Sequence, residues 1–126
     1  SEIITEIQIP QAQKGSGSAY YKVERKVGDY ATSGVAVALV LDDTGRCSQI
    51  GIGLTNVSTV PMRLSRAEEL LSGQIITDAL IQEAGKIASE DCEPSSDLRG
   101  SEAYKRSVTD TLTQRMLNVA LERAKQ

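Results

Sequence analysis

The stretch VAVALVLDDTGRCSQIGIGL, residues 35–54, decides the fold that this sequence predicts. Its first part, Val35 to Leu41, is a continuous apolar run rich in valine, which is typical of a strand covered on both faces. Asp42, Asp43 and Gly45 then supply the residue types of a tight turn. The chain is therefore expected to reverse its direction directly after the apolar run.

The second half of this stretch predicts the return strand of an antiparallel hairpin. Ile50, Ile52 and Leu54 fall on one face of that strand, and Gly51 and Gly53 fall on the other. Glycine inside a strand often marks the close approach of another element, so we expect a helix or a neighbouring chain to pack there. A phosphate-binding role is the weaker alternative, because no helix is predicted directly after these glycines.

Three segments precede the hairpin. Residues 2–10, EIITEIQIP, alternate isoleucine with polar residues and predict a half-buried strand that ends at Pro10. Residues 11–19, QAQKGSGSA, resemble a mobile Gly/Ser connection. Residues 20–26, YYKVERK, are interpreted as extended.

The second half of the sequence is helical. Ser65 and Glu68 have the spacing of a capping box, and Gly73 is a stop signal, which together predict a short helix from Arg66 to Ser72. A second helix is expected to begin at Thr77, and its apolar face carries Leu80, Ala84, Ile87 and Ala88.

A loop and a long final helix complete the predicted elements. CEPSSDLRG, residues 92–100, has the composition of a loop, and Ser101 has the residue type of a helix cap. The apolar stripe of this helix runs through Tyr104, Val108, Leu112, Met116, Leu117, Ala120, Leu121 and Ala124.

Strands first and helices second predict an α+β fold in a single domain, residues 1–126. We expect a two-layer sandwich, in which an antiparallel sheet of three or four strands has about three helices on one face. Because Val35 to Leu41 is apolar on both sides, its second side is expected to be covered by a loop or by a partner.

Composition excludes several classes of protein. With 40% hydrophobic and only 3% aromatic residues, the core must consist of aliphatic side chains. A net charge of -3 argues against non-specific binding of nucleic acid, which requires a basic surface. No apolar run approaches the roughly 18 residues of a membrane span and no leader pattern is present, so we expect a soluble, cytoplasmic chain. Cys47 and Cys92 are too few for a disulfide framework and are expected to be reduced.

The sequence contains no histidine, which excludes Ser-His-Asp and Cys-His catalytic sites and imidazole-zinc centres. An autonomous enzyme that uses carboxylates would need a suitably placed pair of acids, and none is evident. We therefore expect no catalytic residue and no metal ligand in this chain by itself.

Four segments, in order along the chain, resemble the C-terminal domain of the FAD-binding (medium) subunit of molybdenum hydroxylases. They are YYKVERKVGDYA, GIGLTNVSTVPMR, RAEELLSG and PSSDLRGSEAYKR. The likeness is to the carbon monoxide dehydrogenase type, with xanthine dehydrogenase more distant, and it covers nearly the whole chain. The opening EIITEIQIP is similar to the strand by which the chain of that family enters this domain.

The resemblance implies a domain that closes over one side of FAD within an oxidoreductase. In such complexes a molybdenum cofactor oxidises a small substrate, 2Fe-2S clusters relay the electrons, and FAD passes them to an acceptor. The implied partners are an N-terminal FAD-binding domain, a molybdenum subunit and an iron-sulfur subunit. The flavin-binding glycine motifs of the family belong to that N-terminal domain and do not precede Ser1, so we expect this chain alone to bind FAD weakly or not at all.

By the resemblance, the loop from Arg25 to Thr32 lies beside the isoalloxazine ring of the flavin. Tyr30 is the best candidate, because a tyrosine can lay its ring face on a flavin. Asp29 would orient the loop or bias the flavin potential. The expected cofactor-binding residues are Lys22, Arg25, Asp29, Tyr30 and Thr32.

A surface ion-pair cluster of little energetic value is the alternative interpretation of this loop, and it is preferred for Lys22, Arg25 and Lys26. Asp97 and Arg99 are expected to fix their own loop through turn and capping bonds.

Two further groups are assigned minor roles. Cys92 is expected to be a bystander. Thr55 and Asn56 suit either a turn or a ligand at the end of a strand.

The rival function is a structural module for subunit docking, or for a homodimer through the sheet face, without cofactor contact. The two functions differ in whether Tyr30 is exposed at a concave edge beside Asp29 or packed inside.

Overall fold

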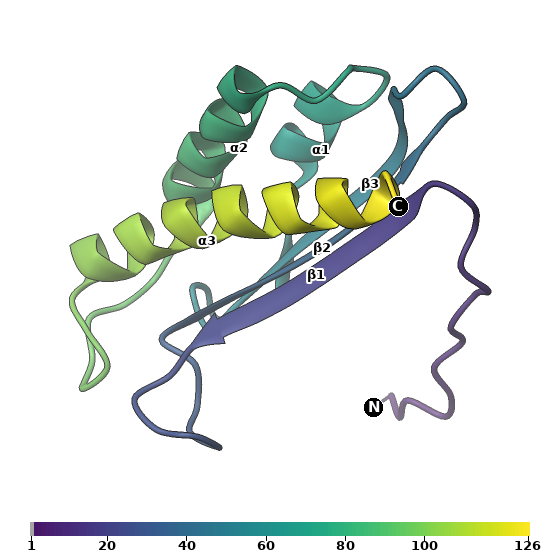
Figure 1. Ribbon diagram of the computed structural model, residues 1–126. Coiled ribbons are helices and arrows are strands. Elements are labelled where there is room, and N and C mark those ends of the chain that lie inside the picture. The colour runs from purple at the N-terminus through teal and green to yellow at the C-terminus, as the bar shows by residue number, and fades with distance from the viewer. Residues whose placement is uncertain (1) are drawn as a thin grey trace.

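The computed structural model describes residues 2–126, which form one antiparallel sheet and three helices. Figure 1 shows the sheet as one layer and the helices as the other. The predicted α+β two-layer sandwich is confirmed. In chain order the elements are β1 (Ser16–Val23), β2 (Ser33–Leu41), β3 (Cys47–Thr55), β4 (Met62–Arg63), α1 (Ser65–Leu71), α2 (Asp78–Asp91) and α3 (Glu102–Ala124).

The strands lie in the order β1-β2-β3-β4, and each pairs with its neighbour in the chain. The predicted hairpin is confirmed, with Val37 opposite Ile52 and a turn that brings Gly45 to a φ of 79°. Glycine suits this left-handed backbone because it has no Cβ to clash. The core forms where the helices meet one face of the sheet, and its fully buried members include Leu39, Ile52, Leu54, Leu71 and Leu117.

The opposite face of the sheet is open over residues 2–126. Ala36 and Ala38 of β2 are exposed, and a side chain added at Gly51 or Gly53 would meet nothing within 4 Å. The expected cover by a loop of the chain and the expected close approach by one of its helices are therefore wrong within residues 2–126, whereas cover by a partner or a neighbouring chain stays a prediction. Alanine makes a strand look continuously apolar in sequence, yet its small side chain costs little to expose.

The N-terminal predictions also fail. Residues 2–10 form no strand, and Ile3, Ile4, Ile7 and Ile9 are exposed, because this segment pairs with no strand of the sheet. The Gly/Ser stretch, interpreted as a mobile linker, instead enters β1 at Ser16. Its small residues are packing positions, since Gly17 lies directly against the backbone of α3 and Ala19 is buried in the core.

The start of α1 differs from the predicted capping box. The cap position is Leu64, and no side chain caps the helix. Glu68 turns toward the sheet, where its carboxylate accepts hydrogen bonds from the Ile52 amide at 2.8 Å and from Arg63 Nε at 2.8 Å. The carboxylate thus satisfies a strand amide just beyond the two-residue β4, which is a better use of the acid than a local cap.

The predicted start of α2 at Thr77 and the predicted cap of α3 at Ser101 are confirmed, and Thr77 also caps its helix. Thr77 Oγ1 accepts from the Leu80 amide at 3.4 Å, and Ser101 Oγ accepts from the Tyr104 amide at 3.2 Å. The predicted stripe of α3 is buried from Leu112 onward, while Tyr104 is half-exposed. Toward the N-terminus the buried face consists of polar residues, namely Lys105, Thr109 and Thr113.

Cys47 and Cys92 are buried free thiols, as expected, and burial raises the pKa of both. Within residues 2–126, the helices are too short or too polar to cross a membrane.

The contact between β1 and α3 yields a test of the fold. In Gly17→Ala the new methyl group would overlap the backbone carbonyl of Ala120, and a helix backbone can yield only if the whole helix moves. We expect a loss of about 1–3 kcal/mol in the free energy of unfolding, the usual cost of overpacking. Gly51→Ala is the matched control on the open face and should change that free energy by less than about 0.5 kcal/mol. Urea unfolding measures both, and equal effects would contradict the close packing.

Candidate functional site

The loop between β1 and β2 projects from one end of the sheet. Its base is closed by the Thr32 amide, which donates to the Val23 carbonyl at 2.7 Å. Its tip turns at Lys26, whose carbonyl accepts from the Asp29 amide at 3.1 Å, with Gly28 between them at a φ of 84°. The loop is therefore a defined turn on a closed base.

The carboxylate of Asp29 makes the central polar contacts of this loop. Its Oδ1 accepts from the Tyr30 amide at 2.8 Å, and its Oδ2 accepts from Arg25 Nε at 3.2 Å. A third partner comes from a distant loop, because Arg99 Nη2 lies 3.5 Å from Oδ1. The side chain is only 10% exposed. The Tyr30 amide, followed by Arg25, holds the pKa of Asp29 below its usual value, so the carboxylate is a fixed anion at neutral pH.

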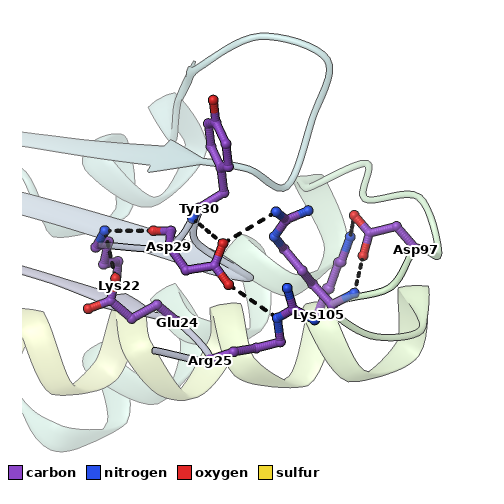
Figure 2. A network of polar contacts seen from close by, with 8 residues as sticks. Lys22, Glu24, Arg25, Asp29, Tyr30, Asp97 and Lys105 are labelled. Atoms are coloured by element: carbon purple, nitrogen blue, oxygen red, sulfur yellow. Dashed lines mark hydrogen bonds and ion pairs between the residues drawn. The ribbon is translucent and has the colours of Figure 1, made fainter. Parts of the chain in front are cut away.

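Lys22, on β1, also contacts this turn. Its Nζ donates to the Asp29 carbonyl at 3.0 Å and lies 2.8 Å from the Glu24 carboxylate. The hydrogen bond to Glu24 raises the pKa of Lys22. Figure 2 shows these side chains meeting around Asp29 while the ring of Tyr30 points away from the network.

Tyr30 combines a fixed backbone with a free ring. The residue is 75% exposed, although Asp29 holds its amide. The guanidinium carbon of Arg99 lies 5.4 Å from the ring centroid, within the range of a cation–π contact. The ring is thus placed by its neighbours but left in solvent.

A second loop, residues 92–101, carries Arg99 to this position. Asp97 Oδ1 accepts from the Arg99 amide at 2.7 Å, and an isolated bridge joins Asp97 to Gly100. Asp97 Oδ2 lies 2.9 Å from Nζ of Lys105, which also donates to the Ser95 carbonyl at 2.7 Å. The expectation that Asp97 shapes its own loop is confirmed.

The structure brings four of the five predicted site residues, Lys22, Arg25, Asp29 and Tyr30, into one network (Figure 2). Thr32 is buried, and its amide closes the base of the loop instead of facing solvent. Lys26 is exposed at the turn. Tyr30 is exposed beside Asp29 and is not packed inside, whereas the concave shape of this edge stays a prediction.

The residues with minor roles also have defined positions. Asn56 adopts a turn conformation with a φ of 63°, and its side-chain Nδ2 donates to Thr55 Oγ1 at 3.3 Å. Cys92 is buried, with its Sγ 3.4 Å from the Ser89 carbonyl.

Sequence reasoning missed two members of the site, Arg99 as a partner of Tyr30 and Lys105 as a buried cation. Neither has a periodic signal, because Arg99 reaches a residue far away in sequence and a lysine on a helix ordinarily predicts a solvated face. Within residues 2–126 no three metal-binding side chains come together. The arrangement fixes the backbone of Tyr30 and leaves its aromatic ring in solvent.

The lowered pKa of Asp97 predicts how the stability of the fold depends on pH. Lys105, then the Arg99 amide, lowers the pKa of Asp97 in the folded chain. A carboxyl group with a lowered folded pKa stabilises the fold above its unfolded pKa, about 4, and loses that contribution as the pH falls through the folded value. Asp97→Asn should therefore reduce the loss of stability between about pH 5 and pH 2, measured by urea unfolding at several pH values. Asp43→Asn, in an exposed turn, is the control, and equal acid profiles for Asp97→Asn and the parent chain would contradict the prediction.

The chain has relatives of known name. Residues 18–120 match the family described as the CO dehydrogenase flavoprotein C-terminal domain. The carbon monoxide dehydrogenase medium chain of Hydrogenophaga pseudoflava is 39% identical over 124 residues, which are 98% of this chain and 42% of the relative. The 6-hydroxypseudooxynicotine dehydrogenase complex subunit alpha of Paenarthrobacter nicotinovorans is 33% identical over 124 residues, again 98% and 42%.

Solved structures agree with the sequence matches. Carbon monoxide dehydrogenase from Hydrogenophaga pseudoflava, in a form that lacks the Mo-pyranopterin moiety, superposes with a TM-score of 0.86 and 40% identity, over 91% of this chain and 40% of the other. Quinoline 2-oxidoreductase from Pseudomonas putida 86 gives a TM-score of 0.81 and 30% identity, over 88% and 39%. This chain spans about two-fifths of the length of these relatives. By sequence and by fold, the chain belongs to the family of CO dehydrogenase flavoprotein C-terminal domains.

Proposed function

We propose that this chain is the C-terminal domain of the FAD-binding medium subunit of a molybdenum hydroxylase, of the carbon monoxide dehydrogenase type, and that its β1–β2 loop closes over one side of the flavin. The observation that carries the proposal is Tyr30, whose ring is 75% exposed while its amide is fixed by Asp29. Leaving a large aromatic ring in water costs free energy, and fixing it in advance reduces the entropy lost on stacking.

The residues around Tyr30 fit an isoalloxazine ring. Val27 and Leu98, at the tips of the two loops, are exposed apolar side chains. A planar ring system with an apolar end suits such a surface. The charge of Asp29 is compensated by Arg25 and Arg99, so the loop does not present an isolated anion to the flavin.

The described residues fit the dinucleotide part of FAD less well. Phosphates commonly bind the free amides at the start of a helix. One first-turn amide in each of α2 and α3 is already engaged, that of Leu80 by Thr77 and that of Tyr104 by Ser101. We therefore propose that the phosphates and the adenosine are held elsewhere in the subunit, and that this chain alone binds FAD weakly.

When bound, FAD accepts electrons and passes them to an external acceptor. The residues of this chain would orient and cover the flavin, and would take no covalent part. The partners proposed with this role are the FAD-binding N-terminal domain, a molybdenum subunit and an iron-sulfur subunit.

The test is Tyr30→Ala in the complete flavin subunit. We expect flavin affinity to fall about 3- to 10-fold, the loss of one aromatic stacking contact, with a change in the visible flavin spectrum. Tyr30→Phe keeps the ring and should retain most of the affinity. Tyr20→Ala removes an exposed tyrosine from the open sheet face and serves as the matched control.

A second measurement tests the isolated chain. Titration of the 126-residue chain with FAD should show no stoichiometric binding at about 10 µM. Submicromolar binding would contradict the division of the flavin site, and an unchanged spectrum and affinity in Tyr30→Ala would contradict the flavin-facing role.

A docking function for the open sheet face is the second candidate. A shallow hollow on this face is lined by small residues, among them Ser18, Ala38 and Gly51, together with Tyr20 and Arg123. The exposed isoleucines of residues 2–10 add apolar surface, which marks interaction sites when it is contiguous. Such a face would dock partner subunits or a second copy of the chain.

The second candidate makes its own prediction. Ala38→Arg places a charged side chain on the open face and should weaken association without lowering the free energy of unfolding. For a homodimer, light scattering should give twice the 13.5 kDa mass for the parent chain and the single mass for the variant. A single mass for both would remove the homodimer, and unchanged co-purification with the partner subunits would remove the docking role.

A further inference from the structure

Lys105 is buried although it carries an ammonium group. It lies near the start of α3, is 3% exposed, and faces Asp97 at 2.9 Å and the Ser95 carbonyl at 2.7 Å. Burying an ammonium group costs more than burying an apolar side chain of similar size, so the packing of α3 alone does not call for a lysine. The pair does fix a loop to the helix, which an apolar side chain could not do.

Asp97 connects Lys105 to Arg99 through its two carboxylate oxygens. One carboxylate oxygen is held by Lys105, and the other accepts from the Arg99 amide at 2.7 Å. The Asp97–Gly100 bridge closes the turn around Arg99. The backbone position of Arg99 therefore depends on a carboxylate that Lys105 holds in place.

Arg99 reaches from this loop to the other one. Its guanidinium lies 3.5 Å from Asp29 and 5.4 Å from the centre of the Tyr30 ring. Its Nε is buried without a hydrogen-bond partner in residues 2–126. Because that nitrogen contributes no hydrogen bond, the orientation of the guanidinium rests on its ion pair with Asp29 and on the placement of the Arg99 backbone.

The same part of α3 also locates the base of the β1–β2 loop. Thr109 Oγ1 donates to the Lys105 carbonyl at 2.8 Å and lies 2.9 Å from Ser33 Oγ, at the start of β2. Since the single hydroxyl proton of Thr109 is used on that carbonyl, Ser33 must donate to Thr109. Residues 105–109 therefore contact the loop near its base directly and near its tip through Arg99.

We propose that Lys105 is a positioning residue, which acts through Asp97 and Arg99 to set the place of Tyr30 beside the flavin. The flavin part of this inference rests on the function proposed above, whereas the chain of contacts does not. Helix capping is the simpler role for the second loop, in which Ser96 Oγ accepts from the Glu102 amide at 2.9 Å. Capping alone predicts no effect of Asp97 on Asp29 or Tyr30.

The first experiment uses Asp97→Asn in the ligand-free chain. Asparagine keeps an acceptor for the Arg99 amide and removes the charge that holds Lys105, and since Asp97 is 41% exposed, the core is retained. Carbon-13 NMR titration should show a small upward move in the pKa of Asp29, because Arg99, the smallest of the influences that lower it, leaves. The ring signals of Tyr30 should move toward those of free tyrosine. In an Arg99→Gln background, Asp97→Asn should have no further effect on either readout.

Two further variants separate positioning from stability. Lys105→Arg keeps the charge and should leave Asp29 and Tyr30 close to the parent values. Glu102→Gln, at the start of the same helix, breaks a pair with Arg106 at 3.0 Å and should leave both readouts unchanged while it alters stability. In the complete flavin subunit, Asp97→Asn should weaken flavin binding about 3- to 10-fold, and should not add to the effect of Tyr30→Ala.

The outcomes distinguish the two proposals. If Asp97→Asn lowers stability but leaves the Asp29 titration and the Tyr30 signals in place, the positioning role is overturned, whatever happens to the flavin. If both readouts shift and Tyr30→Ala leaves flavin binding intact, the positioning of the loop stands and the flavin-facing function fails.

Discussion

The close approach of α3 to its neighbours is the constraint on which the rest of the structure depends. On the sheet side, a side chain at Gly17 would overlap the Ala120 backbone, and on the α2 side, a side chain at Gly85 would overlap Asp110. At Gly17 backbone atoms of α3 leave no room for a Cβ, and at Gly85 the side chains of Asp110 and Gln114 leave little, so both neighbours pack closely against α3. The sheet end from which the β1–β2 loop projects and the start of α3 are thereby held in a fixed relation, which no flexible loop contact could maintain.

This rigidity explains why one helix has two kinds of buried face. Its C-terminal half buries Leu117, Ala120 and Leu121 against the core, where apolar area supplies the free energy. Its N-terminal half buries Lys105 and Thr109, whose hydrogen bonds reach two loops. Polar groups at such positions cost stability unless they are paired, and here they are paired with the segments that hold the site. The C-terminal half of α3 therefore packs against the core, and its N-terminal half holds the two loops in place.

Sequence patterns predicted the elements that depend on local chemistry and missed those that depend on tertiary contact. The hairpin from residue 35 to 54 and the caps at Thr77 and Ser101 follow from turn and cap residues, and all are present. Glu68 does not cap its helix, because its carboxylate accepts a hydrogen bond from the Ile52 amide of β3. The Gly/Ser stretch enters β1, because its small residues allow the strand to pack closely against α3. In the site, the family resemblance supplied the Asp29 loop, whereas the partnership with Arg99 requires the fold.

The packed face of the sheet and the exposed apolar surfaces of the chain lie on different sides of the fold. The helices cover one face of the sheet, and the other face remains uncovered in residues 2–126 (Figure 1). At the end of the sheet, Tyr30, Val27 and Leu98 stand in solvent on loops whose backbones are tied down. Exposed apolar side chains on an ordered backbone lose little entropy when they meet a partner, since the ordering cost has been met during folding. Such a surface keeps its shape without a partner, and its apolar side chains contribute binding free energy only when a partner covers them. These properties suit a domain that completes a binding site by closing over it.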